Sequence, residues 1–344
     1  MTTHLEREIH EQPEALRRLL NEESEHIADM AGKIRDFDPT FVLIAARGTS
    51  DNAARYAQYA LGIEYGLPVA LAAPSIHTLY HAQPRMNRAL VIGISQSGRS
   101  EDVRQVIDDA RALGALTLSI TNEPESPIAQ AAANHIWLRC GEELAVAATK
   151  TYTTQVMALA MLVGALTGHA EMQTALTAMP DHMQATLALA EGMAEWVGQY
   201  RDSERYAVLG RGYHYCTAFE IGQKVKEMNS VTCEQYSEAD FRHGPIAIVQ
   251  RGFPVIVVAP TGKPLPLMID LLDKLKARGA ERIVITDQPD IQAEQKVMLP
   301  GGMPEWLAPI CAVAPGQIYA MRLAEAKGLP IDQPEGLTKV TVTR

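Results

Sequence analysis

The chain contains little cysteine for its length and no closely spaced pair of cysteines. Its 344 residues include four, and they lie far apart: Cys140, Cys216, Cys233 and Cys311. Isolated thiols without a C-x-x-C pair are typical of reduced cysteines in a cytoplasmic protein, with disulfides or zinc as the less favoured alternative. We therefore expect a cytoplasmic protein with free thiols and no bound metal.

Long apolar runs and an excess of positive charge are lacking as well. The longest apolar stretch, residues 156–166, is too short to span a bilayer and contains Gly164. Lysine and arginine number 31 against 41 aspartates and glutamates, which gives a formal charge of −10. This balance argues against nucleic acid or a membrane as the main partner, although a local site can still bind a small anion. The polar N-terminus T-T-H-L-E-R-E-I-H-E does not resemble a signal or transit peptide.

Apolar runs of strand length alternate with helical spacing in the first half of the chain. After an amphipathic helical segment that is interrupted near Pro13, we predict four strands: residues 41–46, 89–94, 116–121 and 135–138. Strands that are apolar on both faces and alternate with helices indicate a mainly parallel sheet covered on both sides.

The same order returns in the second half. Gly48 and Gly212 lie 164 residues apart, as do Gly98 and Gly262, and each pair follows a strand-like run. R-A-L-G-A at 111–115 and K-A-R-G-A at 276–280 match at an offset of 165. Three matches in nearly one frame indicate a duplicated fold.

We therefore predict the α/β class, with two doubly wound, flavodoxin-like parallel-sheet domains. The expected organisation is a helical segment and two domains followed by a tail: residues 1–38, 39–178, 179–330 and 331–344. The two sheets are joined by a long helical region, roughly 150–203, whose break at Met179-Pro180-Asp181 suits a turn between helices.

Hydroxyl groups gather where two predicted strands end. The loops at 48–50 and 95–100 read G-T-S and S-Q-S-G-R-S, and a helix follows each. In open parallel sheets the ligand crevice lies beyond the carboxyl ends of the strands, and helix N-termini there offer free N–H groups. The candidate donors are five hydroxyls and one amide: Thr49, Ser50, Ser95, Ser97, Ser100 and Gln96. Such a set can bind the oxygens of a phosphate without a lysine.

Helix capping is the alternative interpretation of these residues, and it would account for Ser50 or Ser100 alone. A nucleotide site is not indicated, because the chain has no G-x-x-x-x-G-K-[ST] motif and the second loop lacks G-x-G-x-x-G spacing.

A second group of polar residues lies further along the chain. Glu220, Lys224 and Glu227 are spaced four and three apart, which places them on one helix face, either as a solvated stripe of ion pairs or as part of a crevice. His243 stands in a Gly-Pro loop, where we do not expect a histidine to serve only as core filling. Lys339, near the end of the chain, reads by itself as an ordinary surface lysine.

These residues carry a family resemblance that covers nearly the whole chain. The sequence resembles tandem sugar-isomerase (SIS) domain proteins, and most of all the isomerase half of glutamine:fructose-6-phosphate aminotransferase. The matching motifs are highly specific together: R-G-T-S-D-N, S-Q-S-G-R-S-E-D, V-A-A-T-K-T-Y-T-T-Q, E-I-G-Q-K-V-K-E, F-R-H-G-P-I-A and D-Q-P-E-G-L-T-K-V-T-V-T.

The resemblance implies roles for the matching positions. The positions at which the family contacts the phosphate and the sugar correspond to eight residues of this chain: Thr49, Ser50, Ser95, Gln96, Ser97, Ser100, Val146 and Ala148. Ala148 replaces the usual serine. Glu227 corresponds to the catalytic glutamate, with Lys224 beside it. His243 corresponds to a ring-opening histidine that the family supplies from the neighbouring subunit of a homodimer, and Lys339 to a tail lysine that can form a Schiff base with the ketose.

The function implied is an amino-sugar-phosphate deaminase and isomerase without a cofactor, acting on a hexosamine or hexose 6-phosphate. Glucosamine 6-phosphate would give fructose 6-phosphate and ammonia. Two features distinguish the chain from the synthase: only about 40 residues precede the first strand, so we expect no glutaminase domain, and Arg99 stands where the synthase has glutamate, as in stand-alone SIS deaminases.

Three alternatives remain. A fructosamine-6-phosphate deglycase and an ammonia-using or partner-fed synthase would share the site. A non-enzymatic sugar-phosphate sensor is the third, but such regulators usually carry a helix-turn-helix domain of about 80 residues, for which we expect the first 38 residues to leave no room.

Overall fold

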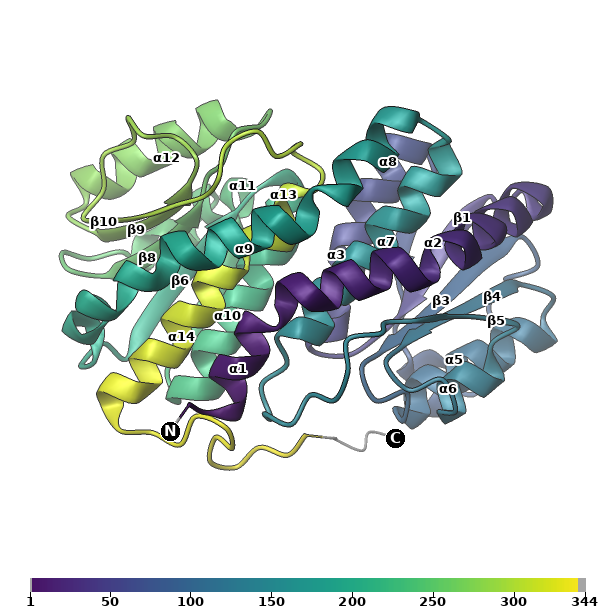
Figure 1. Ribbon diagram of the computed structural model, residues 1–344. Helices are drawn as coiled ribbons and strands as arrows, with labels where there is room; N and C mark the ends of the chain where they lie inside the picture. The colour runs from purple at the N-terminus through teal and green to yellow at the C-terminus, as the bar shows by residue number, and fades with distance from the viewer. Residues whose placement is uncertain (1, 340–344) are drawn as a thin grey trace. The chain divides into compact units, whose positions relative to one another are not determined.

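The computed structural model describes residues 2–339 and divides into two compact units, each assembled from more than one stretch of chain (Figure 1). The first-sheet unit comprises Glu14–Glu143, Lys150–Ala178 and Thr338–Arg344. The second-sheet unit comprises Met1–Pro13, Leu144–Thr149 and Met179–Leu337. Each unit is built around a five-stranded sheet.

The first sheet has the strand order β2-β1-β3-β4-β5, and every neighbouring pair is parallel. Its strands are β1 (Phe41–Ala45), β2 (Val69–Leu71), β3 (Ala89–Ser95), β4 (Leu116–Thr121) and β5 (Asn134–Trp137). The central strand β3 is buried along its entire length, which explains its unbroken apolar sequence.

Helices cover both faces of the first sheet. The helices of this unit are α3 (Thr49–Ala60), α4 (Ser75–Thr78), α5 (Glu101–Ala112), α6 (Pro127–Ala131), α7 (Lys150–Thr167), α8 (Ala170–Thr177) and most of α2 (Gln12–Phe37). Helix α3 packs against α7, and it is prolonged by one π-helical turn, Leu61–Tyr65. Helix α5 packs on β3 with α4 and α6 beside it, around a core that includes Val91, Val103 and Ile107.

The second sheet repeats this plan. Its order is β10-β9-β8-β6-β7, again with every pair parallel, and it matches the first sheet strand for strand. Its strands are β6 (Arg205–Gly210), β7 (Thr232–Ser237), β8 (Pro254–Val258), β9 (Glu281–Thr286) and β10 (Gln295–Met298). Two doubly wound sheets of one topology confirm the predicted fold class and the duplication.

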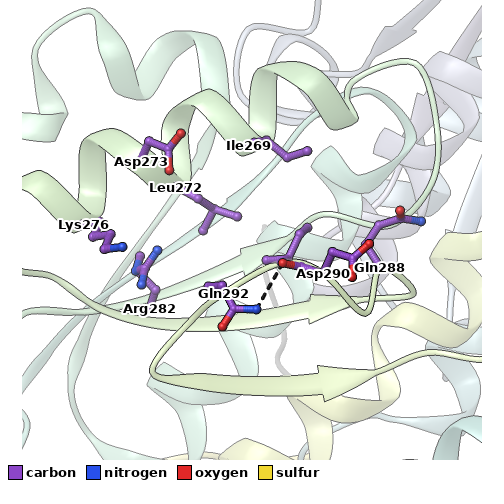
Figure 2. A pocket seen from close by; sticks show the side chains of 9 residues that line it. Ile269, Leu272, Asp273, Lys276, Arg282, Gln288, Asp290 and Gln292 are labelled. Carbon is purple, nitrogen blue, oxygen red and sulfur yellow. Dashed lines mark hydrogen bonds between the residues drawn. The ribbon is translucent and has the colours of Figure 1, made fainter.

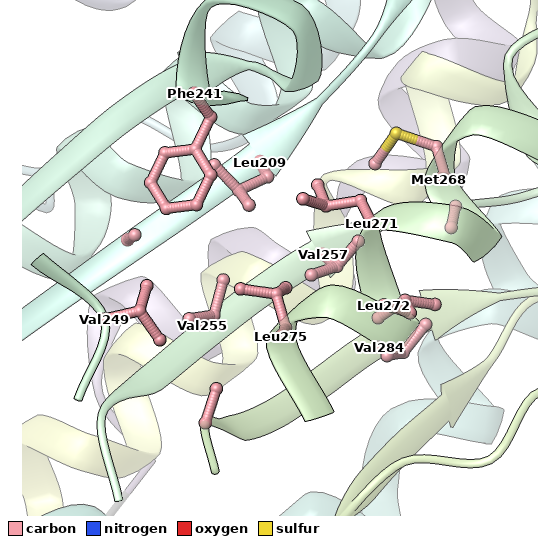
Figure 3. Close-up of a cluster of buried hydrophobic side chains, with 13 residues drawn as sticks. Leu209, Phe241, Val249, Val255, Val257, Met268, Leu271, Leu272, Leu275 and Val284 are labelled. Atoms are coloured by element: carbon pink, nitrogen blue, oxygen red, sulfur yellow. The ribbon is translucent and has the colours of Figure 1, made fainter. Parts of the chain in front are cut away.

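The helices of the second-sheet unit also lie on both faces of its sheet (Figure 1). They are α1 (His4–His10), α9 (Met179–Ala190), α10 (Tyr215–Asn229), α11 (Glu238–Arg242), α12 (Leu265–Ala277), α13 (Ala308–Ala312) and α14 (Ala314–Lys327). Short 3-10 turns occupy Glu191–Glu195, Val197–Tyr200, Gly212–His214 and Pro245–Ile248. Figure 3 shows side chains of α12 meeting β8, with Leu271, Leu275 and Val257 in the cluster. Helix α10 packs on β6, β7 and α14.

The predicted strands are present with small shifts at their ends, and the break at 179–181 is the start of α9. Three strands were not predicted: β2, β7 and β10. Each lies at an edge of its sheet, where burial on both faces is not required. Among the described residues, no helix is both long and apolar enough to cross a membrane.

The close approach of α10 and α14 depends on Gly316. A Cβ atom added there would lie 2.2 Å from Cγ1 of Ile221. We therefore expect Gly316→Val to lower the free energy of unfolding by about 1–3 kcal/mol through overpacking, measured by urea denaturation. Gly192→Val is the matched control, because a Cβ at Gly192 would meet no atom within 4 Å. Equal effects of the two substitutions would contradict the packing argument.

Candidate functional site

The two hydroxyl-bearing loops lie at neighbouring positions on one edge of the first sheet. They follow β1 and β3, which are adjacent in the sheet although β2 lies between them in sequence. The chain reverses its direction of strand addition at this point, and in doubly wound sheets such a point forms the ligand crevice. The loops run directly into α3 and α5, each of 12 residues. Both helices therefore direct free N–H groups and a positive dipole end to this edge.

Helix capping does not account for the hydroxyls. Ser100 occupies the N-cap position of α5, but its side chain makes no capping hydrogen bond. The N-cap residue of α3 is Gly48, and Ser50 lies inside that helix, where its Oγ accepts a hydrogen bond of 3.0 Å from Nε2 of Gln155. The hydroxyls are thus available for another role at the carboxyl edge of the sheet.

The second loop is a tight turn held by its own serines. Oγ of Ser95 accepts from the Gly98 N–H at 3.1 Å, and Oγ of Ser97 accepts from the Arg99 N–H at 3.4 Å. Gly98 has a φ of +63°, and a Cβ added to it would lie 2.0 Å from Oγ of Ser126. A residue with a side chain is excluded on both counts, so the loop depends on this glycine.

An ion pair that the sequence analysis missed connects the two loop regions. Nε of Arg47, just after β1, donates to Oδ2 of Asp102 at 2.7 Å. Asp102 is fully buried, and its other oxygen accepts the Val103 N–H at the start of α5. The motif letters R-G-T-S and S-E-D contain both residues, but no sequence spacing shows that they pair. This contact ties the loop after β1 to the start of α5 and pairs Arg47 with a buried carboxylate.

The charged residues of α10 are buried rather than solvated. Lys224 is 1% exposed; its Nζ lies 2.6 Å from Oε2 of Glu227 and 3.5 Å from Oε1 of Glu220. Gln223 donates to the other oxygen of Glu227 at 2.7 Å. Glu220 is fully buried, whereas the Glu227 side chain keeps 25% exposure. The interpretation as a solvated stripe is therefore wrong, and Glu227 is the member of the cluster that a ligand can reach.

The charge of Glu227 is set by its neighbours. Burial alone would raise the pKa of its carboxyl group, but the positive charge of Lys224 and the hydrogen bonds from Lys224 and Gln223 outweigh burial and lower that pKa. The carboxylate is therefore ionised at neutral pH and can accept a proton.

His243 belongs to the same unit as Glu227. It follows α11, its backbone N–H donates to the Asp240 carbonyl at 3.1 Å, and its side chain is exposed. Within the described part of the chain no hydrogen bond of its imidazole is recorded. Its predicted contribution to the site of a second subunit stays a prediction.

The segment with Val146 and Ala148 lies in the second-sheet unit, and both residues are partly exposed. The Val146 N–H donates to the Asp332 carbonyl at 2.9 Å, and the Asp332 carboxylate accepts the backbone N–H groups of His4 and Leu5 at the start of α1. These contacts hold 144–149 beside the beginning of the tail, as a backbone surface with little side-chain polarity.

Lys339 is paired within the first-sheet unit. Its Nζ lies 2.8 Å from Oε2 of Glu143, whose side chain is fully buried. Lys339 is therefore not a free surface lysine. Glu143 is another functional candidate that the sequence analysis missed.

The second sheet has an equivalent edge, but its loops differ from those of the first sheet. By the repeat offset of 164, Ser95, Gln96 and Ser100 correspond to Ala259, Pro260 and Pro264, which have no side-chain donors. The chain also fills this edge itself, because Oε2 of Glu305 accepts the Lys263 N–H at 2.9 Å. The phosphate site is therefore expected at the first sheet and not at the second.

One pocket in the second-sheet unit lies apart from the predicted site residues. It measures about 320 Å³ and lies between α12 and the segment after β9, with Ile269, Asp273 and Lys276 on one side and Gln288 and Asp290 on the other (Figure 2). It carries no candidate catalytic group.

Comparison with known proteins identifies the family of this chain. The family model for the SIS domain matches residues 39–165 and 199–324, one match for each sheet. The chain belongs to the SIS family. It is 33% identical over 358 residues to glutamine–fructose-6-phosphate aminotransferase of Xanthomonas campestris, and the match covers 98% of this chain and 59% of that protein. The chain thus spans somewhat more than half of this relative and corresponds to its isomerase part.

Solved structures agree with this placement. A SIS protein of Silicibacter pomeroyi, provisionally named a phosphosugar isomerase, has a TM-score of 0.85 and 33% identity, with 96% of this chain and 99% of that chain covered. The C-terminal domain of the aminotransferase from Francisella tularensis has the same fold, with a TM-score of 0.85, 24% identity and coverage of 97% and 99%. The chain is thus a protein with two SIS domains.

Gly98 offers a test of the SIS phosphate loop. We expect Gly98→Ala to weaken fructose 6-phosphate binding roughly tenfold or more, because the loop must move to relieve the clash with Ser126. Calorimetric titration measures the affinity. Gly114→Ala is the control: Gly114, after the end of α5, also has a positive φ (+83°), but a Cβ there would meet no atom within 4 Å. Unchanged affinity in Gly98→Ala would place the phosphate elsewhere.

Proposed function

We propose that the chain is an amino-sugar-phosphate deaminase and isomerase that converts glucosamine 6-phosphate and water to fructose 6-phosphate and ammonia. The observation that carries the proposal is the Lys224–Glu227 pair on α10, in which an ionised carboxylate remains partly accessible beside a buried ammonium. The hydroxyl loops of the first sheet support it, because they offer neutral donors for a sugar phosphate.

The phosphate is assigned to the first-sheet loops. Thr49, Ser50, Ser95, Gln96, Ser97 and Ser100 would donate hydrogen bonds together with the N–H groups that begin α3 and α5. Neutral donors suit a phosphate here because Arg47 is already paired with Asp102. Backbone groups of Val146 and Ala148 are assigned to the sugar.

Proton transfer is assigned to Glu227. The open-chain amino aldose carries its acidic hydrogen on C2, next to the carbonyl. The carboxylate would take that proton and return it to C1, while O1 gains a proton and the amino nitrogen loses one, which leaves a C1 alcohol and a C2 imine; water then adds at C2 and ammonia leaves. Lys224 would stabilise the negative charge that develops on the intermediate. The isomerisation moves a proton between adjacent carbons and needs no redox cofactor.

His243 is assigned to opening the pyranose ring, by moving a proton between O1 and O5. Its exposed position fits a residue that completes the site of a second subunit, and we propose a homodimer on this basis. Lys339 is assigned to the open-chain ketose, either as a hydrogen-bond donor or through a Schiff base.

The direct test is ammonia release from glucosamine 6-phosphate by the wild-type protein and by Glu227→Gln. We expect this substitution to lower kcat at least about a hundredfold, because an amide cannot accept the proton, while substrate affinity is retained. Glu204→Gln, at an exposed glutamate of the same unit, should leave the rate unchanged. A Glu227→Gln protein with nearly normal turnover would show that another group is the base.

The same assay separates the alternatives. Faster turnover of fructosamine 6-phosphate than of glucosamine 6-phosphate would indicate a deglycase. Formation of glucosamine 6-phosphate from fructose 6-phosphate and ammonia as the dominant direction would indicate a synthase. Tight binding of these sugar phosphates without any turnover would indicate a sensor and would overturn the proposal.

Lys224 offers a test through pH. Because Lys224 lowers the pKa of Glu227, Lys224→Met should raise that pKa, since only Gln223 and Lys226 are then left to oppose the effect of burial. Glu227 acts in its ionised form, so the acid limb of the kcat profile should move to higher pH by the same amount. Gln223→Leu removes only one hydrogen bond and should give a smaller shift. If the acid limbs of the kcat profiles coincide in the wild type, Lys224→Met and Gln223→Leu, Glu227 is not the titrating base.

A further inference from the structure

Lys339, the last residue of the tail that the structure describes, contacts a buried carboxylate. Nζ of Lys339 lies 2.8 Å from Oε2 of Glu143, and the two residues are 196 positions apart in the chain. The Lys339 side chain is 23% exposed, whereas the Glu143 side chain is fully buried. The amine therefore meets solvent on one side and a fixed anion on the other.

Glu143 is itself held in place by α7. Its Oε1 accepts the Thr151 N–H at 3.1 Å, and its Oε2 accepts the Thr151 hydroxyl at 2.8 Å. Thr151 belongs to the first turn of α7, a helix of 18 residues, so the positive end of the helix dipole also stabilises the carboxylate. These contacts fix the position of the Glu143 carboxylate.

A lysine side chain has several rotatable bonds and loses much conformational freedom when it is placed accurately. A charge-assisted hydrogen bond to a rigid acceptor offsets that loss. We infer that Glu143 is the positioning residue for Lys339: it orders the end of the tail before substrate binds and holds the amine where a sugar carbonyl can reach it. This inference rests on the proposed function only for what the amine reacts with.

In the chemistry that follows, the Lys339 ammonium first gives a proton to the Glu143 carboxylate or to water; the resulting amine adds to the C2 carbonyl of fructose 6-phosphate, and loss of water leaves an imine. Sodium borohydride reduces the imine to a secondary amine, which marks Lys339 permanently. The yield of this adduct at early times measures how well the amine is placed.

The first experiment compares the rate of borohydride trapping on Lys339, read by peptide mass spectrometry with fructose 6-phosphate present. We expect Glu143→Gln to lower the rate roughly tenfold to a hundredfold, the scale of a misplaced reacting group. Glu143→Asp keeps the charge and should recover part of the rate. Glu142→Gln removes a charge at the adjacent exposed position and should behave as wild type. Trapping in Glu143→Gln at the wild-type rate would overturn the inference.

A purely structural role for Glu143 in capping α7 is tested by Thr151→Val. This substitution removes the hydroxyl bond to Glu143 but leaves the ion pair with Lys339. We expect its trapping rate to stay close to that of wild type. A loss as large as that of Glu143→Gln would assign the effect to helix stability instead.

The second experiment is independent of the reaction. Hydrogen exchange of the backbone amides at 335–339 should become at least about tenfold faster in Glu143→Gln and in Lys339→Met, and no faster still in the double variant, because both remove one contact. Unchanged exchange would overturn the positioning role. If Glu143→Gln shows the faster exchange but the wild-type protein turns over no amino sugar phosphate, the proposed function is wrong and the positioning role of Glu143 still holds.

Discussion

A lysine ammonium buried between two carboxylates on α10 is the contact on which the chemistry depends. Burying Lys224 with Glu220 and Glu227 requires the loss of their hydration, and such clusters contribute little net stability compared with apolar packing. Their physical effect is electrostatic: the ammonium keeps the Glu227 carboxylate ionised although burial favours its neutral form. In the proposed reaction this carboxylate would accept a proton at neutral pH, and the Lys224 ammonium beside it would stabilise an enediol-like intermediate.

One topology serves two different purposes in this chain. Both sheets have the same strand order, but the loops at the carboxyl edge of the second keep fewer hydroxyl groups, with Thr261 at the position of Ser97. In the second, Ala259, Pro260 and Pro264 replace donors, and the Glu305 carboxylate accepts a backbone N–H group of the loop. The second unit instead carries the buried charges of α10. In the proposed function, the loops of the first unit would bind the anion and α10 of the second unit would carry the base for proton transfer.

The sequence was informative where chemistry or burial leaves a local pattern. Inner strands such as β3 are buried on both faces and read as continuous apolar runs, whereas β7, T-C-E-Q-Y-S, lies at a sheet edge and resembles a loop. The hydroxyl loops and the spacing of Lys224 and Glu227 are visible in the sequence itself, because each is a local pattern. Glu143 could not, because its importance lies in a partner 196 residues away and no local pattern encodes a tertiary contact.

The central claim is that the first-sheet loops bind the phosphate while Glu227 acts on the carbon skeleton of the same molecule. The most direct measurement is a crystal structure of the Glu227→Gln protein with glucosamine 6-phosphate bound. The account predicts phosphate oxygens within hydrogen-bond distance of Ser97 and Ser50, with C1 and C2 within reach of the residue at 227. Phosphate bound elsewhere, or a side chain at 227 directed away from the sugar carbons, would contradict it.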